Sequence, residues 1–123
     1  MSESDELYAS VNYIKNKVDA IEKIELLNLR SNEKLLNEYL YQLKSDEWLL
    51  KVYKEINGVK SQKTIATDLA TNEMMVSRKI DKLSAIGLIE IMDISGNQRI
   101  YKYSIAENAF NLIDKIDKRK NER

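Results

Sequence analysis

Residues 61–89 read SQKTIATDLATNEMMVSRKIDKLSAIGLI and contain two short helical patterns separated by a tight break. Ser61 is a good N-cap residue for the first pattern. The apolar face of this first helix consists of Ile65, Ala66 and Leu69. Thr71 and Asn72 interrupt the face, and Asn72 can cap a second helix. The stretch therefore predicts a helix, a turn and a helix.

The second helix is expected to extend to about Ala85. Its apolar residues Val76, Ile80 and Leu83 recur at spacings of four and three, so they form one buried side. Gly87 is expected to end the helix in a left-handed conformation. The opposite side of this helix is then left in solvent.

A β-hairpin is expected next. Residues 88–94 predict a strand, residues 95–98 a turn, and residues 99–103 a returning strand in which apolar and charged residues alternate. Upstream of the quoted stretch, Ser45 is a candidate N-cap for a further helix that Asn57-Gly58 would end. Trp48 lies on the apolar stripe of that helix, which favours a role as a core anchor.

This order of helix, helix, turn, helix and hairpin, with short connections, is the layout of a winged helix-turn-helix. The sequence resembles that DNA-binding superfamily, and most of all the small MarR-type and ArsR-type regulators of bacteria and archaea. The matching positions are Ile65-Ala66, Leu69, Asn72, Val76-Ser77-Arg78, Ile80, Leu83 and Gly87-Leu88-Ile89. The resemblance implies a mainly α fold with one β-hairpin that binds double-stranded DNA. Where the family turn often has a glycine, this chain has Ala70 or Thr71.

The outward face of the helix after Asn72 is the candidate reading surface, because an α-helix fits the major groove of DNA. Arg78 and its neighbours could reach base edges or phosphates from there. We expect at least one of Met74 and Met75 to pack against the protein instead. Acidic residues on the same helix would repel phosphates unless they are turned away.

The hairpin would be the wing, and its basic residue Arg99 either contacts DNA or pairs with Asp93 across the hairpin. Lys102 lies farther down the strand and could contact a phosphate. The candidate DNA contacts are Ser61, Thr64, Asn72, Met74, Met75, Ser77, Arg78, Lys82, Asn97, Gln98, Arg99 and Lys102.

The N-terminal section, residues 7–44, contains no glycine or proline and carries a heptad-like apolar stripe. The register fails at Glu25 and Asn28 and then resumes, either through a stutter in one long helix or because Ser31 or Asn32 caps a second helix. The stripe either packs on its own domain or pairs with the same stripe of a second chain. We favour pairing, because an exposed apolar face of this length would be a liability.

A C-terminal helix is expected from Ser104, where Ser104 and Glu107 match a capping box. Its apolar stripe would complete the dimer interface. The candidate interface residues are Val11, Ile14, Val18, Ile21, Leu29, Leu36, Phe110, Ile113 and Ile116.

The composition excludes several classes of protein. The 123 residues include no cysteine and no histidine, so disulfides, thiol catalysis, imidazole chemistry and the usual zinc sites are absent. With no glycine-rich phosphate loop, we predict neither an enzyme nor a metal or cofactor, and a small-molecule effector is not visible. No stretch approaches the roughly 18 apolar residues that span a bilayer. A cytoplasmic, nucleoid-associated protein is expected.

Charge is balanced over the whole chain, with 20 basic and 20 acidic residues. The balance is an average over unlike segments, because residues 60–104 contain seven basic and five acidic side chains. DNA is therefore not excluded as a partner, but non-specific attraction to phosphates should be modest and sensitive to salt.

Three segments are predicted: a dimerisation segment in residues 1–44, a winged helix-turn-helix in residues 45–104, and a C-terminal helix in residues 105–123. We interpret the chain as a homodimeric, sequence-specific transcription regulator, most simply a repressor. The alternatives are a centromere-binding or origin-binding protein of a plasmid or virus, an architectural chromatin protein, and a protein-interaction module that does not touch DNA.

Overall fold

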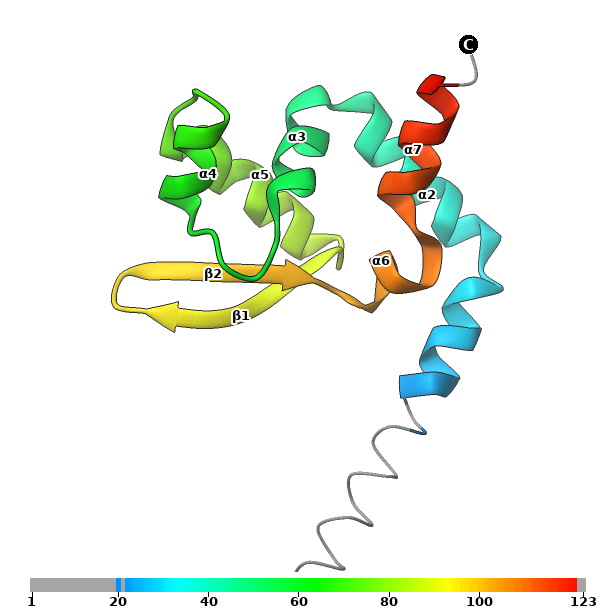
Figure 1. Cartoon of the computed structure of the whole chain (residues 1–123). Coiled ribbons are helices and arrows are strands. Elements are labelled where there is room, and N and C mark those ends of the chain that lie inside the picture. Colours follow the sequence, from blue (N-terminus) through cyan, green and yellow to red (C-terminus); the bar gives the residue numbers. More distant parts are fainter. Residues whose placement is uncertain (1–19, 21, 122–123) are drawn as a thin grey trace, which may run out of the picture.

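The computed structural model describes residue 20 and residues 22–121 of the chain. This part is mainly helical, with one two-stranded antiparallel sheet along one side (Figure 1). Residues 22–30 are helical. They are followed by α2 (Glu33–Ser45), α3 (Glu47–Glu55), α4 (Gln62–Asp68), α5 (Glu73–Ala85), β1 (Ile89–Ser95), β2 (Gln98–Tyr103), α6 (Ile105–Phe110) and α7 (Leu112–Asn121).

Within the described part of the N-terminal section, the chain breaks into two helices. The helical residues 22–30 end in a turn at Ser31, and Asn32 then caps α2. The Oδ1 atom of Asn32 accepts a hydrogen bond from the backbone N–H of Leu35 at 3.1 Å. Asparagine favours caps because its side chain competes for local backbone hydrogen bonds. The structure therefore agrees with the second explanation of the broken heptad register, in which Asn32 caps a new helix.

The N-cap of α3 is Asp46, one residue after the expected Ser45. The Oδ1 atom of Asp46 accepts a hydrogen bond from the N–H of Leu49 at 3.1 Å, whereas Ser45 is the last residue of α2. A carboxylate is the better cap here, because its charge also interacts favourably with the positive end of the helix dipole.

Trp48 is not the core anchor that the sequence suggested. It is half-buried, and the ammonium of Lys51 lies 4.5 Å from the centroid of its ring. The fully buried positions of α3 are Leu49, Val52 and Tyr53. They define a stripe that places Trp48 at the edge of the core, where a lysine can cover the ring.

The helix-turn-helix forms as predicted. The Oγ atom of Ser61 accepts the N–H of Thr64 at 3.3 Å, and Oδ1 of Asn72 accepts the N–H of Met75 at 2.8 Å. On α5, the three predicted inner residues Val76, Ile80 and Leu83 are all fully buried. The apolar spacing of four and three therefore gave the correct rotation of α5.

The turn between α4 and α5 depends on Ala70, whose φ angle is +53°. After it, the N–H of Thr71 donates to the carbonyl of Ala66 at 2.9 Å and closes the turn. A left-handed conformation costs an L-residue about 1–2 kcal/mol, which is why glycine is common at such positions. This chain thus adopts a glycine-like conformation with an alanine.

The hairpin β1–β2, called the wing below, has a tighter turn than predicted. The strands pair from Ile89 with Tyr103 to Ser95 with Gln98, so only Gly96 and Asn97 remain in the turn. Gly96 has φ +62°, as a two-residue hairpin turn requires. An isolated antiparallel bridge between Ser61 and Ile100 also ties the start of α4 to the wing.

The C-terminal section bends at Asn111, which is left-handed with φ +49°, and so forms two short helices. Ser104 caps α6, but the reciprocal half of the predicted capping box is absent. The carboxylate of Glu107 instead accepts hydrogen bonds from the hydroxyl of Tyr53 at 2.6 Å and the N–H of Ile113 at 3.2 Å. Burial, and secondarily this bond to Glu107, raises the pKa of Tyr53 well above the usual phenol range, so the hydroxyl remains a donor.

Two of the residues predicted at a dimer interface belong to the protomer's own core. Phe110 and Ile116 are 1% and 3% exposed, so they leave no surface for a second chain. The helical spacing of apolar residues is the same whether they face a core or an interface. In this chain, Phe110 and Ile116 face the core. Leu29, Leu36 and Ile113 are half-buried against the same core. The positions Val11, Ile14, Val18 and Ile21 lie outside the described residues.

Together α3, α4, α5 and the wing form a winged helix-turn-helix, which confirms the predicted fold class (Figure 1). The N-terminal and C-terminal helices are joined to it through one core: Tyr39 and Leu43 of α2 and Phe110 of α6 pack in the same cluster as α3 and α5. In the described part of the chain, no helix is long and apolar enough to cross a membrane.

The left-handed Ala70 gives the first test. We expect Ala70→Gly to raise the free energy of unfolding by about 0.5 kcal/mol, since relief of the strained backbone exceeds the entropy that glycine adds to the unfolded chain. Urea denaturation measures the change. Ala85→Gly, at an exposed position of α5, is the matched control and should lower the free energy of unfolding by about 0.5 kcal/mol. A destabilised Ala70→Gly variant would contradict the assigned turn.

Candidate nucleic-acid interface

The exposed residues of α5 are Glu73, Met74, Arg78, Asp81, Lys82, Ser84 and Ala85. Their direction follows from the core side of the helix, because residues opposite a buried stripe point outward. Met74 is 66% exposed, whereas Met75 is half-buried and is the methionine that packs against the protein. Ser77, also a predicted contact, is half-buried. Of the two exposed basic residues of α5, Arg78 and Lys82, only Lys82 has an acidic partner among the described residues.

One flank of α5 is tied to the start of α3 by an ion-pair cluster. The Nζ atom of Lys79 lies 2.7 Å from Oδ2 of Asp46, and the Nζ atom of Lys82 lies 3.9 Å from the same oxygen. Lys82, predicted to contact DNA, is exposed but shares this carboxylate. Asp46 thus links the N-cap of α3 to α5.

The pKa of Asp46 reflects these contacts. Partial burial acts to raise it, but hydrogen bonds from Lys79 and from the N–H of Leu49, together with the charges of Lys79 and Lys82, outweigh burial and hold the pKa below its usual value. The carboxylate therefore stays charged and keeps its bond to Lys79 at neutral pH.

The predicted contacts at the two helix N-termini have structural roles as well. The side chains of Ser61 and Asn72 accept backbone N–H groups as caps, and the Ser61 and Thr64 hydroxyls lie 3.2 Å apart. Thr64 and Asn72 are exposed, and Ser61 is half-buried. Asn72 stands at the start of α5, and Ser61 stands at the start of α4, where its backbone bridges to Ile100 of the wing.

At the wing, Asn97, Gln98 and Arg99 are exposed at the tip. Arg99 does not pair with Asp93: its direct partner across the hairpin is Ile94, and Oδ1 of Asp93 accepts the N–H of Ile94 at 2.8 Å. Lys102, by contrast, lies 3.3 Å from the carboxylate of Glu90 on the opposite strand.

Ion pairing divides the seven basic residues of residues 60–104 into two groups. Lys60 pairs with Glu55 and Asp68, while the other paired lysines are Lys79, Lys82 and Lys102. Among the described residues, no acidic group pairs with the remaining three, which are Lys63, Arg78 and Arg99. These three come from α4, α5 and the wing, respectively.

Lys63 is not among the contacts predicted from the sequence, although its place in the first turn of α4, next to the predicted contact Thr64, was a signal for it. Lys79 is also absent from the predicted contacts, because its pairing with Asp46, 33 residues away, leaves no local pattern in the sequence.

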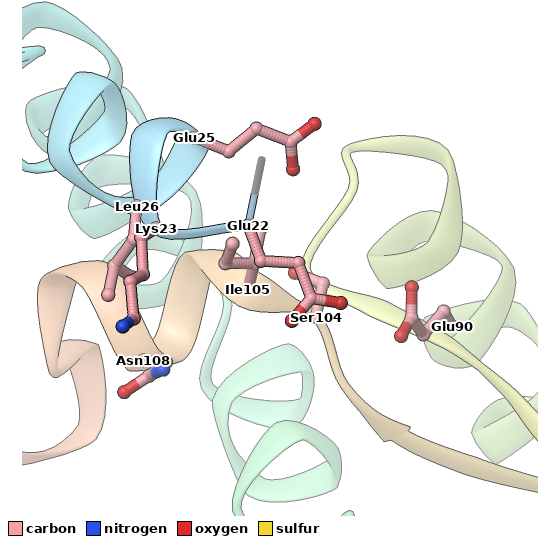
Figure 2. A pocket seen from close by; sticks show the side chains of 8 residues that line it. All are labelled: Glu22, Lys23, Glu25, Leu26, Glu90, Ser104, Ile105 and Asn108. Atoms are coloured by element: carbon pink, nitrogen blue, oxygen red, sulfur yellow. The ribbon is translucent and has the colours of Figure 1, made fainter. Parts of the chain in front are cut away.

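A cavity of about 580 Å³ lies between the helical residues 22–30, the base of β1 and α6 (Figure 2). Its lining consists of Glu22, Lys23, Glu25, Leu26, Glu90, Ser104, Ile105 and Asn108. The lining contains three glutamates and one lysine, so the charge of this cavity does not favour an anionic ligand. In the described part of the chain, no group of histidine, cysteine, aspartate and glutamate side chains is arranged to hold a metal ion.

One solved structure similar to this chain is the crystal structure of the transcriptional regulator SlyA. The two share 16% sequence identity and a TM-score of 0.49, and the match covers 94% of this chain and 75% of that chain. No protein-family model matches the sequence, and no curated protein matches it at a significant level.

The cluster around Asp46 predicts a pH-dependent contribution to stability. In Asp46→Asn the side-chain oxygen can still accept the capping hydrogen bond of α3, but the charge that interacts with the helix dipole and with Lys79 is lost. We expect the free energy of unfolding at pH 7 to fall by about 1 kcal/mol. Urea denaturation over a pH series measures it.

The sign of the pH effect follows from the lowered pKa. A carboxyl whose pKa is lower in the folded state contributes stability above its unfolded value, here 3.8, and loses it as the pH falls through the folded value. The difference between wild type and Asp46→Asn should therefore shrink below pH 3.8. Asp81→Asn, at an exposed position of α5, controls for the change of net charge. A difference that stays constant into acid would contradict this role of Asp46.

Proposed function

We propose that this chain is a homodimeric, sequence-specific regulator of transcription that binds double-stranded DNA through α5 and the wing. The observation that carries the proposal is the placement of Lys63, Arg78 and Arg99, the cations of the winged domain that no described acidic residue pairs with, on α4, α5 and the wing. An α-helix fits the major groove, and an arginine on its outward face can contact guanine or phosphate.

Dimerisation is part of the proposal. The helical residues 22–30 pack Leu26 and Leu29 on the core but leave Ile24 and Leu27 59% and 64% exposed. These two lie next in sequence to the stripe that ends at Ile21. A second copy of the chain would remove such apolar surface from water.

A two-fold dimer would place its α5 helices in successive major grooves. The preferred site is then roughly palindromic, with half-sites about one helical turn apart. A repressor needs only to occupy a promoter, so we assign repression. Genome-wide footprints at a few promoters would support this role, whereas a cluster of short repeats or broad coverage would favour a segregation or an architectural role.

Arg78→Ala tests the reading surface. Against the duplex recovered by selection from a random-sequence pool, we expect the variant to lose about tenfold or more in affinity while remaining dimeric, because one arginine contact to a base is worth ~1–3 kcal/mol. Gel shifts measure affinity and sedimentation measures assembly. Arg30→Ala, an exposed arginine outside the winged domain, is the matched control and should bind as wild type.

Two other results would count against the proposal. Equal affinity of Arg78→Ala and wild type would show that the recognition surface lies elsewhere. A wild-type protein that retains no duplex at low salt would instead support a protein-interaction module.

The N-terminal stripe is tested by charge. Val18→Glu and Ile21→Glu should convert the dimer to monomers in sedimentation velocity, since a buried unpaired carboxylate is costly. Asn16→Glu adds the same charge off the stripe and should leave the dimer intact. A dimer that survives both stripe substitutions would move the interface to other residues.

A further inference from the structure

Ile94 and Arg99 lie directly opposite each other near the tip of the wing. Directly opposed residues of an antiparallel pair project from the same face of the sheet. Ile94 is 60% exposed, and Arg99 is exposed beside it. The wing tip therefore presents an apolar side chain and a cation together, only one residue pair away from the turn-closing pair of Ser95 and Gln98.

This face of the wing continues toward α5. In β2, Arg99 and Tyr101 lie on one face because strand residues alternate, and Tyr101 is opposite Ile91. A groove of about 420 Å³ separates this face from α5, and its lining includes Asp81, Ser84, Ile91 and Arg99. The exposed pair at the tip is thus continuous with the surface that α5 offers to DNA.

A β-bulge at Met92 sets the direction of Ile94. The register shifts between Ile91 and Asp93, so that Ile91 and Ile94 share a face although they are an odd number of positions, three, apart in the strand. Met92 itself lies against the loop before α4: a Cβ atom added to Gly58 would be 2.9 Å from its sulfur. Without the bulge, strict alternation would place Ile94 on the face away from Arg99.

The winged domain has few cations without an acidic partner among the described residues, so an exposed apolar side chain could add affinity that these cations do not supply. Only Lys63, Arg78 and Arg99 of the winged domain have no acidic partner among the described residues. Each neutralised phosphate adds about 0.9 to the salt slope of binding, so three cations per protomer supply a limited electrostatic attraction. Contacts that do not depend on salt must contribute to a specific affinity.

We propose that Ile94 packs against the deoxyribose rings that line the minor groove of DNA, next to the contact that Arg99 makes there. The inference rests on the proposed function. The wing inserts with its α5-facing side against one wall of the groove, Arg99 meets the negative potential of the groove, and Ile94 removes apolar sugar surface from water. Ile94 contributes affinity that does not change with salt.

Salt titration separates the two side chains. The probe is the duplex recovered by selection from a random-sequence pool, and log K is measured against log salt. Ile94→Thr should lower the association constant roughly fivefold at every salt concentration and leave the slope unchanged, since it removes buried apolar surface but no charge. Arg99→Gln should instead lower the slope by about 0.9 for each protomer. Threonine is also β-branched and keeps the wing strand favourable.

Met92→Thr is the matched control, because Met92 is also exposed, at 57%, but lies in the bulge against Gly58. It should bind as wild type. Unchanged affinity of Ile94→Thr, a changed slope, or an equal loss in Met92→Thr would overturn the proposal for Ile94. These outcomes leave the proposed function intact if wild type still binds the selected duplex, whereas absence of wild-type binding would remove both.

Discussion

The packing of α5 against α3 is the contact on which the rest of the structure depends. Both helices have fully buried stripes, with Val76, Ile80 and Leu83 on one and Leu49, Val52 and Tyr53 on the other, and the two helices pack together. This burial fixes the rotation of α5 and therefore which of its side chains reach solvent. Asp46 adds a polar constraint, because its carboxylate caps α3 and pairs with Lys79. The packing of the core thus determines which side chains of α5 are exposed.

Ion pairs neutralise many of the basic residues of the winged domain. Four of the seven basic residues in residues 60–104 have acidic partners, and each such pair neutralises charge that composition alone would assign to a DNA surface. A cation already paired must give up its partner before it meets a phosphate. Among the described residues, the winged domain therefore has fewer unpaired cations than its composition suggests, and in the proposed complex it would attract DNA less strongly than seven unpaired cations would.

Local patterns in the sequence predicted the elements whose causes are local. The caps at Ser61 and Asn72, the inner side of α5 and the left-handed Gly87 all depend on neighbours within four residues, and the structure contains them. The failures have distant causes. Glu107 does not complete the predicted capping box, because its carboxylate accepts a hydrogen bond from the hydroxyl of Tyr53, 54 residues away. Phe110, predicted at a dimer interface, is buried in the protomer's own core. Helical spacing identifies a buried side but not the element that covers it.

The helices that flank the winged domain are bound to it at the point where α5 ends. The hydroxyl of Tyr39 on α2 donates to the carbonyl of Ile86 at 2.9 Å, and the hydroxyl of Ser104 donates to the carbonyl of Gly87 at 2.6 Å. Both carbonyls belong to the short link between α5 and β1, where Gly87 adopts φ +86°. In a dimer built through the N-terminal section, a rigid connection of this kind would transmit the position of α2 directly to α5. The separation of the two α5 helices in such a dimer would then depend on the packing of the flanking helices, because the carbonyls of Ile86 and Gly87 after α5 are already hydrogen-bonded to Tyr39 and Ser104.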